Sequence, residues 1–264
     1  MPLALAFALM NRQVASMFSN EDTNRKMLEG SYKKLKSYYS YNKNFVFMKE
    51  KISEFEFDNS KMEHSLENLS AILMNLDSRA NKKSINQWID NIDFFVMPKS
   101  FVDKSEKNQM FVSGNAQENK PVNKVNFFID MPMELHLLET LWTVLVGKIA
   151  QDKGIITADC YGNCIDNKVV YNHEKDYLSS INFDKNKLFK IYFYQYCDWK
   201  NKVIKAIEKN YKSKKDTALF SLDIKSYYYS VNFKFKNLPI LLENDENLKK
   251  IERLTNVIGN RPKT

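Results

Sequence analysis

The feature that most constrains the fold is residues 217–235, TALFSLDIKSYYYSVNFKF, where an apolar run leads to one acid and then to aromatic residues. The run from Ala218 to Leu222 predicts a buried strand, and Asp223 follows directly at its end. Residues 227–229 are all tyrosines. Because hard divalent cations prefer carboxylate and carbonyl oxygens, such a strand end can hold a metal ion beside a nucleotide whose sugar meets the rings.

The charge of the chain favours a polyanionic partner. The 264 residues carry a net charge of +8, with a pI near 9.1. Nucleic acid fits this charge better than an anionic membrane surface, and no uninterrupted apolar run approaches the ~18 residues that a membrane span needs. The apolar start, MPLALAFALM, lacks the basic and small-residue marks of a signal peptide, so we expect a buried helix there.

The cysteines argue for a reducing compartment. Cys160, Cys164 and Cys197 make no disulfide framework, so a cytoplasmic location is expected. A zinc site from these three and His173 would have loose spacing and a distant fourth ligand, and is disfavoured. The six glycines include no phosphate loop of the GxxxxGK type, which disfavours an NTPase.

Residues 1 to about 90 predict helices. A helix start at Asn20–Thr23 is followed by apolar residues at spacings of three and four, and residues 62–78 repeat that pattern. The segment 32–39, YKKLKSYY, allows two interpretations. Its lysines could bind phosphates while its tyrosines stack on bases, or it could be an amphipathic helix with a solvated lysine face. The second interpretation is the favoured one.

A β-hairpin and a long helix are expected next. Residues 92–98 predict a strand closed by Pro98, residues 103–121 a loop or hairpin tip, and residues 124–129 the returning strand. Five lysines would surround the tip: Lys99, Lys104, Lys107, Lys120 and Lys124. Residues 132–150 predict a helix with one apolar face, on which His136 would be a packed or surface residue. Residues 187–211 and the last twenty residues predict further helices.

Residues 217–235 fill every position of the first catalytic-aspartate motif of reverse transcriptases, Asp-Ile-x-x-aromatic-aromatic-x-x-aliphatic, with Val231 as the closing aliphatic. Upstream segments resemble other parts of bacterial reverse transcriptases in the same order, over about residues 30–235. These segments are 94–99, 128–132, 160–163 and 192–199. The chain resembles the abortive-infection and defence-associated branch of that family, and most of all a reverse transcriptase of the type 3 anti-phage system.

The resemblance implies an α+β fold in three parts. Residues 1–90 would form a mostly helical N-terminal region, residues 91–215 the fingers with a β-hairpin and packed helices, and residues 216–264 the start of an incomplete right-hand polymerase palm. The implied function is RNA-directed DNA synthesis in antiviral defence. The implied partners are an RNA template and its DNA product, with a non-coding RNA and a companion reverse transcriptase as associates, and no membrane.

The resemblance also assigns site residues. Asp223 would be the first catalytic carboxylate and would bridge two Mg²⁺ ions, one of which the carbonyl of Ile224 would also hold. Tyr228 would stand where the family keeps its sugar gate, which excludes a ribose 2′-hydroxyl. Lys99 and Lys124 would neutralise the incoming triphosphate. Many family members carry an arginine where Lys124 stands, so this role would fall to a point charge without a bidentate fork.

A departure from the family concerns the second acidic motif. The chain contains no Asp-Asp dipeptide and ends about 40 residues after Asp223. We therefore expect the N-terminal part of a longer polymerase, inactive by itself. The alternative is a non-catalytic fingers module that binds RNA or a partner protein.

Overall fold

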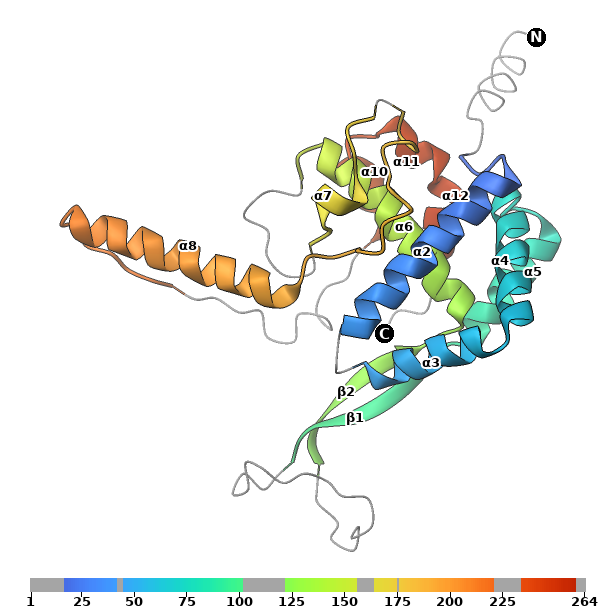
Figure 1. Ribbon diagram of the computed structural model, residues 1–264, viewed down its shortest axis with the longest axis horizontal. Coiled ribbons are helices and arrows are strands. Elements are labelled where there is room, and N and C mark those ends of the chain that lie inside the picture. The colour runs from blue at the N-terminus through green and yellow to red at the C-terminus, as the bar shows by residue number, and fades with distance from the viewer. Residues whose placement is uncertain are drawn as a thin grey trace, which may run out of the picture.

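The computed structural model describes residues 17–41, 45–101, 122–155, 164–174, 176–220 and 234–259. Over these ranges the chain is mostly helical, with a two-stranded antiparallel sheet (Figure 1), which confirms the α+β class. Several predicted features lie outside the described residues. These are the N-terminal helix, the hairpin tip, the turn at 160–163 and the motif residues Asp223, Ile224 and Tyr228.

The described residues of the first part of the chain form four helices, in agreement with the prediction of a mostly helical region: α2 Glu21–Tyr41, α3 Val46–Phe57, α4 Asn59–Met74 and α5 Arg79–Asp90. The predicted helix start is confirmed, since the Asn20 side chain accepts a hydrogen bond from the Thr23 amide at 2.8 Å. Asp58 and Ser78 cap α4 and α5 in the same way. A side chain therefore caps the start of α2, α4 and α5, whereas α3 begins after Phe45 without a side-chain cap.

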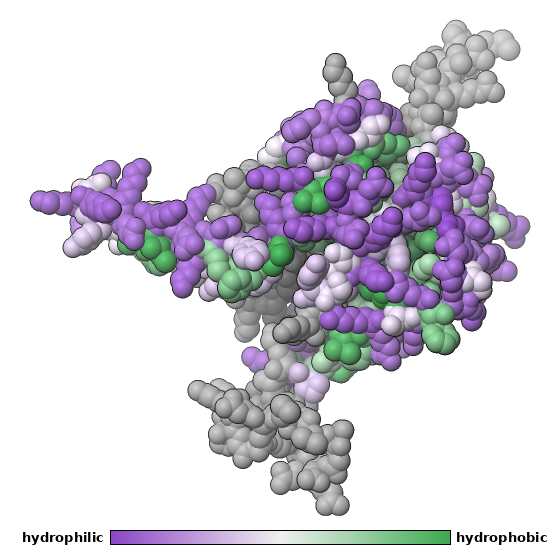
Figure 2. Space-filling model, viewed as in Figure 1, coloured by the Kyte–Doolittle hydropathy of each residue, from purple (hydrophilic) through white to green (hydrophobic). Residues whose placement is uncertain are grey.

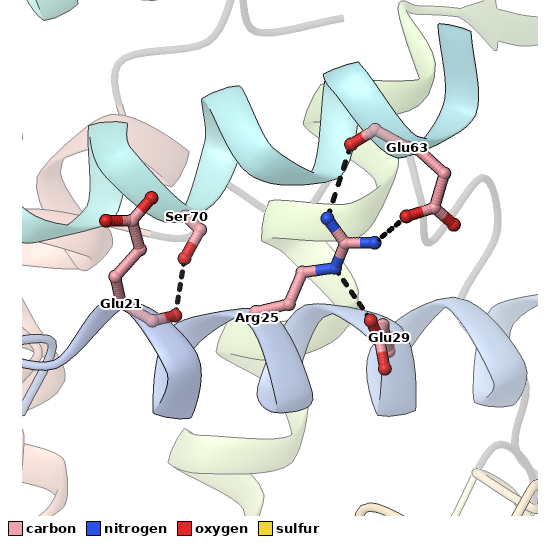
Figure 3. A network of polar contacts seen from close by, with 5 residues as sticks. All are labelled: Glu21, Arg25, Glu29, Glu63 and Ser70. Carbon is pink, nitrogen blue, oxygen red and sulfur yellow. Dashed lines mark hydrogen bonds and ion pairs between the residues drawn. The ribbon is translucent and has the colours of Figure 1, made fainter. Parts of the chain in front are cut away.

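A polar network fixes α4 against α2 (Figure 3). The guanidinium of Arg25 donates to the Glu29 carboxylate at 2.7 Å and to the Glu63 carbonyl at 3.3 Å, and it pairs with the Glu63 carboxylate. One turn earlier, the Ser70 hydroxyl donates to the Glu21 carbonyl at 2.7 Å. These contacts fix the orientation of α4 on α2, because a hydrogen bond to a charged group requires a defined geometry.

The long helix α6, Met133–Asp152, is the centre of the core (Figure 1). It contacts α2, α3 and α5 from the first part of the chain. It also contacts α11 Glu246–Lys250 and α12 Glu252–Gly259, which follow η1 Phe235–Asn237 and α10 Leu238–Leu241. Thirteen of its twenty residues are buried, including His136, so the prediction of one apolar face was too narrow. A helix that is buried on most sides belongs to the interior of a domain.

The burial of Lys34 contradicts the prediction of a solvated lysine face on α2. The amphipathic interpretation is confirmed for Tyr32 and Leu35, which are buried, but Lys34 is fully buried as well. Its ammonium donates to the carbonyls of Asn182, at 2.7 Å, and of Lys185. A charge in the interior needs such acceptors. Lys34 thereby joins α2 to a segment 148 residues further along the chain.

Burial of Lys34 predicts a specific pH dependence. Burial lowers the pKa of this amine from 10.5 to about 8, against a smaller opposite effect of Asp184. Between these pH values the unfolded chain binds more protons than the folded chain, so folded stability rises with pH, by at most about 1.4 kcal/mol per unit. Relative to Lys34→Met, the wild type should gain about 1–2 kcal/mol between pH 8 and pH 9.5 in urea unfolding. A difference that stays constant over this range would contradict the buried amine.

The helix α8, Tyr192–Lys212, projects from the body of the molecule (Figure 1) and confirms the helix expected at 187–211. Before it, α7 Asn167–Val170 and two isolated bridges, Ile165 with Phe189 and Tyr171 with Ile181, hold the chain against the core. After it, Lys214 has a φ of 51°, and the chain turns back along α8.

The described start of the expected buried strand is not a strand. Leu219 and Phe220 are 66% and 83% exposed, and residues 217–220 pair with no other segment in the described part of the chain. A strand requires a neighbour to satisfy its backbone groups, and apolar sequence alone supplies none. The prediction of a buried strand is therefore wrong for these residues.

Candidate nucleic-acid interface

A β-hairpin forms where the sequence predicts it. Strand β1, Asp93–Phe101, pairs antiparallel with β2, Val122–Asp130. The sequence predicted that Pro98 closes the strand. Instead, Pro98 lies within β1 and pairs with Val125. Proline lacks the amide hydrogen of a ladder bond, and it is tolerated here because each strand of a two-stranded sheet has a free edge.

The register places the two predicted phosphate-binding lysines at one stretch of the hairpin. Ser100 pairs with Lys124, so the backbone of Lys99 lies next to that of Lys124. The register shifts on both sides of Ser100, which marks an irregularity in the ladder. Lys124 is exposed. Two lysine positions at one stretch of the hairpin give it a local positive charge, which suits a polyphosphate or the phosphates of a nucleic acid strand.

Aromatic contacts hold the root of the hairpin on α3. The rings of Phe47 and Phe95 are stacked, with centroids 4.5 Å apart and an interplanar angle of 9°, and Phe45 meets Phe128 edge-on. Offset stacks and edge contacts of this kind add stability beyond the apolar area that they bury. The pair of apolar residues Phe45 and Phe47 is the one signal in the sequence for these contacts, which were not predicted.

An ion pair completes this attachment. Lys51 of α3 pairs with the Asp130 carboxylate at the end of β2, and its ammonium also donates to the Met131 carbonyl at 2.9 Å. Both side chains are partly buried, so the pair is less screened than one at the surface. The direction in which the hairpin leaves the body is therefore set by α3 as well as by α6.

A cavity of about 550 Å³ lies between the hairpin, α2, α3 and α6. Its walls combine rings, such as Tyr39 and Phe95, with the polar side chains of His136 and Glu139. Burial raises the pKa of Tyr39, so its hydroxyl ionises only at a higher pH than that of an exposed tyrosine. A few polar groups among apolar walls are typical of sites that bind small planar molecules.

The outer face of the hairpin is apolar and exposed. It consists of three cross-strand pairs: Phe94 with Ile129, Val96 with Phe127, and Pro98 with Val125. The large side chains of this face are 38–55% exposed. Since the opposite face already packs on α3, the sheet presents apolar residues on both sides. A face of this kind marks an interaction surface in a folded protein.

The predicted metal ligands cannot be placed, because Asp223 and Ile224 lie outside the described residues. Within the described ranges, no group of three or more histidine, cysteine, aspartate or glutamate side chains is arranged to hold a metal ion. Cys164 and Cys197 form no disulfide within the described residues. In the same ranges, no helix has the length and apolar character to cross a bilayer.

Comparisons with protein-family models, with curated proteins and with solved structures each find no match to this chain. The class of protein is therefore defined by the molecule itself. It is a basic α+β protein with a helical core, a projecting hairpin that carries Lys99 and Lys124, and a projecting helix α8. These elements and the sequence motifs are the basis for any more specific function.

Proposed function

We propose that this chain is the fingers and first palm segment of an RNA-directed DNA polymerase that acts in anti-phage defence. The observation that supports the proposal best is the hairpin. It forms at the residues that the motif order requires, runs directly into the long helix α6, and has Lys99 and Lys124 at adjacent positions. The net charge of +8 suits a nucleic acid partner.

In this proposal the two lysines bind the phosphates of the incoming nucleotide or of the template. A fixed positive charge beside a phosphate stabilises the negative charge that develops during nucleotidyl transfer. The Asp223 carboxylate and the Ile224 carbonyl would hold Mg²⁺, which supplies Lewis-acid activation when it is bound. The ring of Tyr228 would exclude a 2′-hydroxyl and so select deoxynucleotides.

The same proposal predicts that these 264 residues alone extend no primer. They contain no Asp-Asp dipeptide, and a single carboxylate leaves a two-metal site short of negative charge. The measurement is incorporation of labelled deoxynucleotides on an RNA template with a DNA primer and Mg²⁺. We expect no product above the background without protein. A single extended primer would contradict the expectation.

A second candidate function is a binding module without chemistry, favoured by the exposed apolar outer face of the hairpin. Nucleotide binding separates the two candidates. In the polymerase, a matched deoxynucleoside triphosphate and Mg²⁺ should tighten binding of the template–primer, and Asp223→Asn should remove that gain. In the module, neither addition should change the affinity, and Asp223→Asn should be silent. Fluorescence anisotropy of a labelled primer measures both cases.

A further inference from the structure

Helix α8 is almost entirely surrounded by solvent. Of its 21 residues only Gln195 is buried, and the Gln195 amide donates to the Lys190 carbonyl at 3.0 Å, close to the start of the helix. Figure 1 shows the rest of the helix extending away from the core. At 1.5 Å per residue the exposed arm is about 30 Å long. Most helix stability in proteins comes from the packing of an apolar face, so the apolar residues that α8 exposes need another explanation.

The exposed residues of α8 form an ordered row of rings and aliphatic side chains. Apolar residues recur every three or four positions and share one face: Tyr192, Tyr196, Trp199, Val203, Ile207 and Tyr211. We call this set the α8 row. Its first three rings are 44–65% exposed, with centroids 6.5 Å apart for Tyr192 and Tyr196 and 5.8 Å apart for Tyr196 and Trp199. Figure 2 shows apolar patches along this arm, between hydrophilic ones.

Helical spacing places Lys200 and Lys202 on the two sides of the Tyr196–Trp199 stretch of the α8 row. Residues 192–216 contain seven lysines and three acids, an excess of four positive charges. Lys200 and Lys202 are both exposed. This charge opposes a second copy of the chain as the occupant, because pairing two such helices would bring like charges together. It favours a polyanion with flat apolar groups.

We propose that α8 binds single-stranded nucleic acid. Its bases would stack on the exposed rings of Tyr192, Tyr196 and Trp199, and its phosphates would lie against the lysines beside them. Stacking on aromatic side chains within a basic surface is how proteins bind single strands without reading their sequence. The inference goes beyond the proposed function, because it uses none of the residues assigned to nucleotidyl transfer.

Removing two rings tests this surface. The probe is a fluorescein-labelled 20-nucleotide oligouridylate, and the readouts are its anisotropy and the quenching of tryptophan emission. The variant Tyr196→Ala/Trp199→Ala should bind at least about 30-fold more weakly, since each stacked ring contributes about 1–3 kcal/mol. Tyr196→Phe/Trp199→Phe keeps the rings and should bind nearly as the wild type does. Phe57→Ala removes an exposed ring from α3 and should have no effect.

The lysines give an independent readout. Lys200→Ala/Lys202→Ala should lower the salt dependence of oligouridylate binding by about 1.4 in the slope of log K against log salt. An unchanged affinity of the ring variant would overturn the inference. So would tighter binding to phosphatidylserine vesicles than to oligouridylate, or a concentration-dependent dimer that the ring variant abolishes. The hairpin variant Lys99→Glu/Lys124→Glu, tested on template–primer in parallel, reports on the polymerase proposal separately.

Discussion

Reversing both hairpin charges, as Lys99→Glu/Lys124→Glu, should weaken the binding of an RNA template–DNA primer by about 30-fold at 0.1 M salt. The register brings the backbones of the two positions together, so both substitutions change the charge of one stretch of the hairpin. Replacing two attractive charges by two repulsive ones therefore acts on the phosphates that meet this stretch. The measurement is anisotropy of a labelled primer at several salt concentrations.

The matched control is Lys26→Glu/Lys83→Glu, which changes the net charge equally at exposed positions of α2 and α5. It should alter affinity only slightly, because exposed charges more than about 10 Å from a phosphate are screened at this salt. The hairpin variant should also lower the salt slope by about 2. An equal effect of both variants would mean that binding depends on net charge and not on the hairpin.

Shortening a core residue of α6, as Leu138→Ala, should lower the free energy of unfolding by about 2–5 kcal/mol. Leu138 is fully buried in a helix that five other helices contact, so the cavity cannot collapse from an open side. Ile240→Ala, at an exposed residue of α10, should cost less than about 0.5 kcal/mol. Urea unfolding of the two variants measures the difference. Equal losses would contradict the central position of α6.

Local patterns predicted the helices and the hairpin well. The cap at Asn20, the proline before α6 and the strand pair at residues 92–129 all depend on residues close together in the sequence. Apolar periodicity and caps report such short-range structure directly. The extent of burial around α6 was underestimated, because periodicity indicates which face is apolar but not how many neighbours surround a helix.

Long-range polar contacts were not predictable in the same way. Lys51 and Asp130 are 79 residues apart, and Lys34 meets carbonyls about 150 residues away. A lysine in an amphipathic pattern is normally solvated, so its sequence context carries no sign of burial. The prediction of a strand at residues 217–220 was wrong for a related reason. A strand is specified by its neighbour as much as by its own residues, and no described segment pairs with this one.

We propose that the hairpin contacts nucleic acid as the fingers of a polymerase do. Amide hydrogen exchange, measured with and without an RNA template–DNA primer, is the direct test of this contact. If the hairpin contacts nucleic acid, amide exchange should slow in β1 and β2 around Lys99 and Lys124. Exchange should stay unchanged in α4 and α5, which belong to the helical part away from those lysines. Protection of α4 and α5 with an unchanged hairpin would contradict the proposal, as would the absence of any protection at saturating template–primer.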